Sequence, residues 1–206
     1  MHPVLVQEIY TCATIDAMRA FSRWEPVLGA ACLFLGLQAL VLFIYGQPWI
    51  AADGTVKLWE GVVLSAGNSQ HIADWYTFSH VIHGLLFYAA LRYLFPNLSF
   101  GQRLLMAMMV EIGWELLENT PMVIDAYRQQ ALAQGYMGDS IINSVSDTLA
   151  MMLGFFFAAR APVSFSIALG LFLEAWVGYS IRDNLTLNVL NFIFKVPLIQ
   201  AWQAGA

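Results

Sequence analysis

Charged side chains are scarce in this 206-residue sequence and make up 11% of it. Soluble globular domains carry about 25% charged residues, so the composition excludes an ordinary water-soluble fold. Lysine and arginine number 9 against 14 acidic residues, and they form no basic run, which argues against a nucleic-acid partner. The two cysteines, Cys12 and Cys32, are too few for a disulfide framework. Cys32 lies within an apolar run and is expected to be a small buried residue.

Apolar residues reach 59% of the chain, which also holds 7 Trp, 8 Tyr and 14 Phe. A chain this apolar and aromatic is not disordered. A membrane-spanning helix needs about 20 mainly apolar residues. Five runs come close to that requirement: 27–46, 75–95, 101–118, 140–159 and 163–181. We therefore expect an all-α fold, a polytopic membrane bundle of about five transmembrane helices.

The two ends of the chain lie outside these five runs. Residues 1–26 are expected to form a cytoplasmic segment, with an apolar spacing that allows a short amphipathic helix. Residues 27–206 are expected to form a single transmembrane domain. Within it, residues 185–202 are apolar but contain Lys195 and Pro197, which predicts a half-inserted or interfacial C-terminal helix.

The distribution of Lys and Arg predicts the orientation in the membrane. On one side of the membrane, the basic residues lie in short connections: Arg19, Arg23, Arg92, Arg103 and Arg160. On the other side, they are spread through longer segments: Lys57, Arg128, Arg182 and Lys195. We therefore expect a multi-pass inner-membrane protein with a cytoplasmic N-terminus. Loops 47–74 and 119–139 are then expected to face the periplasm.

Polar residues gather in the outer halves of four of the apolar runs. They are His80 and His83; Glu111, Glu115 and Glu118; Asp139, Asn143 and Asp147; and Glu174. A rise of 1.5 Å per residue places four of them at a similar depth, roughly 12 Å below the outer boundary: His83, Glu111, Asp147 and Glu174. A central charge costs about 2.5–3.5 kcal/mol on insertion scales, so intramembrane carboxylates indicate function. The pattern predicts a polar pocket open to the outer face.

Two chemistries fit this pocket. His80 and His83, at i and i+3, are candidate ligands of a divalent metal such as zinc, with one of Glu115, Glu118 or Asp147 as a further ligand. Such a metal would generate hydroxide from water. Without a metal, paired carboxylates would share a proton and carry out general acid–base hydrolysis. The candidate catalytic carboxylates are Glu115, Glu118, Asp139 and Asp147, with Glu115 the preferred base. The candidate substrate-binding residues are His71, Asp74, Asn119, Asn143, Arg182 and Asp183.

The same motifs also have purely structural interpretations. The histidines can hydrogen-bond to a neighbouring helix, and the glutamates can form a buried network that Asn119 caps. Asp139 can serve as a helix N-cap. Arg182 and Asp183 can form an interfacial charge pair.

A set of short motifs recurs through roughly residues 30–206. They are Lys57-Leu58-Trp59, Asn68-Ser69-Gln70-His71, Asp74-Trp75-Tyr76-Thr77, Ser79-His80, His83-Gly84, Trp114-Glu115, Glu118-Asn119-Thr120, Gly138-Asp139-Ser140, Asn143-Ser144, Asp147 and Arg182-Asp183. In this set the chain resembles a family of small multi-pass inner-membrane proteins of alphaproteobacteria, catalogued as being of unknown function. The resemblance implies an inner-membrane location and carries no activity. Members of that family have Cys-x-Cys before the Lys-Leu-Trp segment, where this chain has Ala51-Ala52-Asp53. A looser likeness exists to VanZ-like membrane proteins, which place Asp and Asn four residues apart on a late helix.

Three functions compete at this point. The first is a membrane-embedded hydrolase or transferase that acts on a lipid or lipid-linked substrate at the outer leaflet. The second is a lipid- or cofactor-binding protein, or an accessory subunit of a larger envelope complex or homo-oligomer. The third, a proton- or ion-coupled carrier, is disfavoured because the chain shows no inverted repeat and the inner halves of the runs hold almost no charge. Membrane lipids are the partners common to all three.

Overall fold

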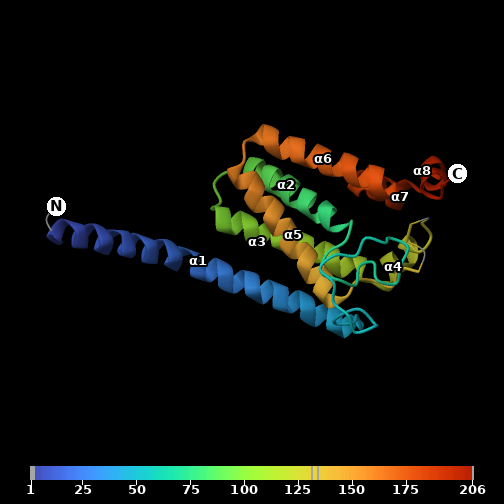
Figure 1. Ribbon diagram of the computed structural model, residues 1–206, viewed down its shortest axis with the longest axis horizontal. Coiled ribbons are helices and arrows are strands. Elements are labelled where there is room, and N and C mark those ends of the chain that lie inside the picture. Colours follow the sequence, from blue (N-terminus) through green and yellow to red (C-terminus); the bar gives the residue numbers. More distant parts are fainter. Residues whose placement is uncertain (1–2, 131, 134, 206) are drawn as a thin grey trace.

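The computed structural model describes residues 3–130, 132–133 and 135–205, with side chains from residue 24 onward. These residues form eight α-helices and no β-strand, which confirms the all-α fold class (Figure 1). The helices are α1 (Pro3–Tyr45), α2 (Thr77–Leu94), α3 (Phe100–Glu118), α4 (Pro121–Tyr127), α5 (Ile141–Arg160), α6 (Val163–Ile181), α7 (Leu185–Phe194) and α8 (Pro197–Gln203).

All five predicted apolar runs are helical. The bounds of α6 coincide with the predicted run, and those of α2, α3 and α5 differ from prediction by at most two residues. Within the described part of the chain, three helices are long and apolar enough to cross a membrane: Trp24–Tyr45, Ile141–Arg160 and Val163–Ile181. The helices α2 and α3 have 18 and 19 residues, close to the length of α6, but they carry most of the ionisable site residues.

The first helix, α1, is continuous through Pro26 from Pro3 to Tyr45. The chain therefore has no helix break at the boundary expected after residue 26. The amphipathic face proposed for residues 1–26 depends on side chains that lie outside the described ones. Cys32 is exposed on the surface of α1, so the expectation of a buried cysteine was wrong. The apolar run around it turns its other face, with Ala31 and Leu42, toward the bundle.

Helix ends follow local sequence signals. Ser99 begins α3 with a capping box, in which its hydroxyl accepts a hydrogen bond from the backbone N–H of Gln102. Ser140 caps α5 in the same way through Asn143. Near the C-terminus the left-handed residues Arg182 and Lys195, with φ of 58° and 47°, end α6 and α7. The apolar tail, expected to form one C-terminal helix, is therefore two short helices that are separated at Lys195 and Val196.

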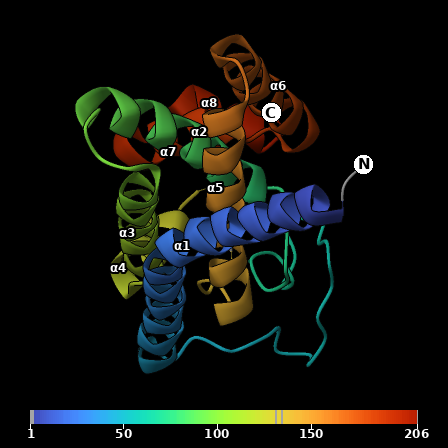
Figure 2. The ribbon, with the colours of Figure 1, turned by 90° about the vertical axis from the view of Figure 1, so that its left-hand side faces the viewer.

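The long helices pack side by side, with α1 and α6 on opposite sides of the bundle (Figures 1 and 2). Helix α1 lies against α3 and α5, and α6 lies against α2 on the opposite side. The buried apolar core includes Met108 of α3 and Met151 and Phe155 of α5. The end of the bundle that is far from the N-terminus holds the loop after α1 and the helices α4, α7 and α8 (Figure 1). The polar residues predicted to share one layer lie at this end.

Candidate functional site

Two glycines bring α2 and α5 into backbone contact. A Cβ atom built on Gly84 would lie 2.0 Å from a backbone oxygen of α5, and one on Gly154 would lie 2.1 Å from a backbone oxygen of α2. Small residues permit this close approach between membrane helices. At this crossing His80 of α2 lies beside Asp147 of α5.

His80 is at the centre of a buried cluster of carboxylates. Its Nδ1 atom lies 2.6 Å from Glu111 Oε1 and 3.3 Å from Glu115 Oε1, and its Nε2 atom lies 3.8 Å from Asp147 Oδ2. His83 contacts the same Glu111, with 3.0 Å between Nδ1 and Oε2. Glu111, Glu115 and Asp147 are at most 4% exposed. Glu115, the preferred base from the sequence, therefore lies beside His80 in the structure.

Two sets of residues bring potential metal ligands together. In each set the ligand atoms lie within 4.8 Å of one another. The first set is His80, His83 and Glu111, and the second is His80, Glu115 and Asp147. Both contain His80, so one imidazole is common to the two.

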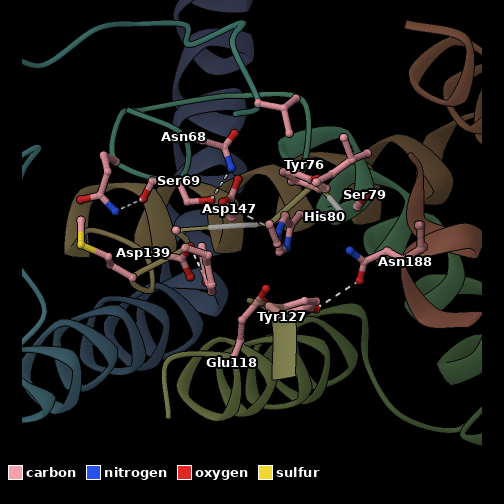
Figure 3. Close-up of a pocket in the computed structure, with 18 of the residues that line it drawn as sticks. Asn68, Ser69, Tyr76, Ser79, His80, Glu118, Tyr127, Asp139, Asp147 and Asn188 are labelled. Carbon is pink, nitrogen blue, oxygen red and sulfur yellow. Dashed lines mark hydrogen bonds and ion pairs between the residues drawn. The ribbon is translucent and has the colours of Figure 1, made fainter. Parts of the chain in front are cut away.

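The cluster forms part of the wall of a cavity of about 200 Å³ (Figure 3). Polar lining comes from α2, α3, α4, α5 and α7 and from the loops before α2 and α5. The ionisable and aromatic lining residues are Tyr76, His80, His83, Trp114, Glu118, Tyr127, Tyr136, Asp139 and Asp147. Figure 3 shows Glu118 pointing into the cavity from α3. No lysine or arginine is among the described residues that line it.

Asp139 and Asn119 join the loop before α5 to the end of α3. The amide nitrogen of Asn119 donates to Asp139 Oδ2 over 2.7 Å, and the backbone N–H of Asp139 donates to Asn119 Oδ1 over 2.7 Å. The hydroxyl of Tyr136 donates to the other Asp139 oxygen over 2.9 Å. Burial raises the pKa of Asp139 to about 6. Asp139 lines the cavity, and its backbone is not the N-cap of α5, which is Ser140.

Three predicted substrate-binding residues instead hold the loop between α1 and α2. Asp74 accepts hydrogen bonds from the backbone N–H groups of Ser69 and Tyr76. Asn143 donates to the backbone oxygen of His71 over 2.8 Å. His71, Asp74 and Asn143 are buried and are not among the cavity-lining residues. Their hydrogen-bonding capacity is used within the loop and at its contact with α5.

The remaining predicted residues, Arg182, Asp183 and Glu174, lie where α6 meets α7. Asp183 is buried and accepts hydrogen bonds from Tyr76 Oη and Gln203 Nε2 over 3.2 and 3.1 Å. Arg182 is exposed and donates to the backbone oxygen of a residue in α8. Glu174 was expected in the polar layer, but its two oxygens accept from the first N–H groups of α7, over 3.0 and 3.1 Å. The unsatisfied N–H groups of a helix N-terminus explain this correction.

Sequence reasoning missed a second layer behind Glu115. The hydroxyl of Ser144 donates to Glu115 Oε2 over 2.6 Å. Gln38 of α1 donates to Ser144 Oγ over 2.9 Å and accepts from Thr148 Oγ1 over 3.0 Å. The four side chains are at most 1% exposed. The sequence signal for Gln38 is a lone amide inside an apolar run.

Comparisons with known proteins identify the family. The family model described as "Protein of unknown function (DUF2585)" matches residues 42–205. The chain is 52% identical to a UPF0314 protein of Rhizobium meliloti (strain 1021), over 92% of this chain and 95% of the relative. It is 49% identical to a UPF0314 protein of Paracoccus denitrificans (strain Pd 1222), over 90% of this chain and 96% of the relative.

A UPF0314 protein of Sphingopyxis alaskensis (strain DSM 13593 / LMG 18877 / RB2256) is 47% identical, over 85% of this chain and 93% of the relative. No solved structure matches the chain. These matches confirm the resemblance to a family of unknown function and give no support to the looser VanZ-like likeness. The chain therefore belongs to the family of proteins of unknown function DUF2585.

Proposed function

We propose that the protein crosses the inner membrane five times, through α1, α2, α3, α5 and α6. The lengths of α2 and α3, 18 and 19 residues, support this count, since 1.5 Å per residue gives roughly 27–29 Å. The excess of Lys and Arg in the short connections supports a cytoplasmic N-terminus. In that orientation the cavity opens toward the periplasm. Residues 27–206 then form one membrane domain that follows a cytoplasmic segment.

We further propose that the cavity is the active site of a hydrolase or transferase. The observation that carries this proposal is the contact of buried His80 with three carboxylates in the wall of an open cavity. Buried charges are costly unless they are paired, so such a cluster within a membrane helix bundle favours chemistry over simple packing.

Glu118 is the residue that we assign as general base. Its side chain lines the cavity and is half-buried, so it is within reach of a molecule bound in the cavity. Glu115, preferred from the sequence, instead lies behind His80 and already accepts from Ser144. A carboxylate that faces the cavity is better placed to take a proton from water or from a substrate hydroxyl.

The lining indicates a lipid or lipid-linked substrate with a neutral or cationic head group. Apolar residues of α7 and of the loop after α4 contribute to the wall, among them Leu132, Met137, Leu185 and Val189. Phosphate groups are usually bound by Arg or Lys, and neither is present in the described lining. The carboxylates Glu118 and Asp139 in the lining would repel an anionic group.

Turnover of membrane lipids tests the proposed activity. Purified protein in lipid nanodiscs is incubated with a total lipid extract of an alphaproteobacterium, and the products are followed by mass spectrometry. We expect a lipid species to be converted by the wild type and to persist with Glu118→Gln. Asp125→Asn is the matched control, because Asp125 is an exposed carboxylate outside the cavity. Stoichiometric retention of one intact lipid without turnover would overturn the enzyme proposal and support the binding function.

A further inference from the structure

We infer that His80, Glu115 and Asp147 together bind one divalent cation in the wall of the cavity. This inference rests on the proposed active site and names its cofactor. The three residues come from α2, α3 and α5, and their ligand atoms lie within 4.8 Å of one another. His80 and Asp147 also line the cavity, so an ion bound there would be accessible to a substrate.

Two carboxylate oxygens in this set lack a hydrogen-bond donor. Glu115 Oε1 and Asp147 Oδ1 are buried and have no hydrogen-bond partner among the described residues. Their residues are 1% and 4% exposed. Buried polar atoms without a partner are rare in proteins because each one loses its interaction with water. A cation bound between these helices would compensate both carboxylates at once.

The hydrogen bonds of Glu111 orient His80 for this role. Glu111 Oε1 lies 2.6 Å from His80 Nδ1, so Nδ1 is already engaged in a hydrogen bond. The other ring nitrogen, Nε2, lies 3.8 Å from Asp147 Oδ2. Metal bonds to imidazole and carboxylate are each about 2.0–2.2 Å long, so one cation bridges that gap with a bent geometry. A carboxylate that holds the distal nitrogen is the usual support of a metal-binding histidine.

The alternative set with His83 is less suitable. It requires Glu111, whose two oxygens already pair with Nδ1 of His80 and Nδ1 of His83 over 2.6 and 3.0 Å. The 2.6 Å distance between Glu111 Oε1 and His80 Nδ1 is that of a direct hydrogen bond. Two ligand atoms of one tetrahedral ion lie roughly 3.4 Å apart when each metal–ligand bond is about 2.1 Å long. We therefore assign His83 to the hydrogen-bonded support of Glu111 and not to the ligands, which revises the predicted ligand pair His80 and His83.

One imidazole and two carboxylates form a donor set for a divalent transition metal such as zinc or manganese. Three protein ligands leave at least one coordination position open, as in catalytic metal sites. Such an ion would lower the pKa of water and polarise a substrate oxygen. Glu118 would then remain free to act as base, because it is outside the ligand set.

Zinc titration of the detergent-purified full chain tests this inference. The protein is stripped with a chelator, Zn²⁺ binding is measured by isothermal calorimetry, and bound zinc is counted by mass spectrometry. We expect one Zn²⁺ per chain in the wild type. The variants Asp147→Asn and Glu115→Gln should each lose at least 100-fold in affinity. His83→Gln distinguishes the two ligand sets, and it should keep the stoichiometry of one.

Two further comparisons keep the result interpretable. Asp147→Glu retains a carboxylate, so stoichiometric zinc in this variant would assign the loss in Asp147→Asn to the missing carboxylate. Circular dichroism of each variant shows whether it is folded. Absence of stoichiometric zinc in the wild type, or loss with His83→Gln but not with Glu115→Gln, would overturn the inference. Zinc bound without lipid turnover would reject the proposed activity alone, whereas turnover by chelator-stripped protein would reject the metal alone.

Discussion

Replacing Gly84 by alanine tests whether backbone contact between α2 and α5 positions the site. The new Cβ atom would lie 2.0 Å from a backbone oxygen and 2.5 Å from a backbone nitrogen of α5. Real Cβ contacts essentially never fall below 3.0 Å, so the helices must separate by about 1.0 Å, the difference between 3.0 and 2.0 Å. Both obstructing atoms belong to the backbone, and no side-chain rotation can relieve the overlap.

The separation has two consequences. Overpacking of this kind costs roughly 1–3 kcal/mol of unfolding free energy. It also moves His80, one helical turn from Gly84, away from Asp147, and a displacement of about 1 Å can cost about 100-fold in a positioned site. We therefore expect Gly84→Ala to be less stable than wild type in detergent unfolding titrations. Its Zn²⁺ affinity should also fall.

Gly113→Ala is the matched control. Gly113 is also a helical glycine, but a Cβ atom there meets nothing within 4 Å. Alanine should be neutral or stabilising by about 0.5–1 kcal/mol, because glycine is the poorer helix former. Equal unfolding curves and equal zinc affinities for the two variants would refute the close helix contact as the device that positions the site.

Three other substitutions test separate parts of the structure. Gln38→Leu removes the donor that orients Ser144 toward Glu115, and we expect about a 10-fold loss of Zn²⁺ affinity by calorimetry; an unchanged affinity would contradict this positioning role. Burial raises the pKa of Asp183 from 3.8 to about 6, so the folded state binds the proton more tightly than the unfolded state does. The resulting stabilisation, roughly 3 kcal/mol, is complete below pH 4 and is lost as pH rises through 6. Unfolding midpoints measured from pH 4 to 7 should show this decline in the wild type. Asp183→Asn should make the decline shallower, and the remainder comes from Asp139, whose pKa burial also raises to about 6. Glu174→Ala removes the acceptor for the first N–H groups of α7, at a cost of about 1 kcal/mol. Hydrogen exchange should then become faster in α7, and exchange at the wild-type rate would show that Glu174 is not needed there.

The helices and their ends could be predicted from the sequence because their causes are local. An apolar run of about 20 residues specifies a long helix wherever it packs. Ser99 and Ser140 mark helix starts through their capping hydroxyls, and Pro162 marks one through its restricted backbone. The helical period also places His80 and His83 on one face, and Glu111 and Glu115 on another. The sequence by itself therefore determined the all-α class, the helix positions and the polar faces.

The partner of each polar side chain depended on the tertiary structure. Glu174 shares the predicted depth of His83, yet the rotation of α6 and the turn at Arg182 direct it to the N-terminus of α7. The closeness of His80 to Asp147 arises at a glycine contact between helices that are distant in sequence. Such pairings depend on helix rotation and crossing, which many neighbouring side chains determine together. Only the tertiary structure could therefore decide which polar residues reach the cavity and which support it from behind.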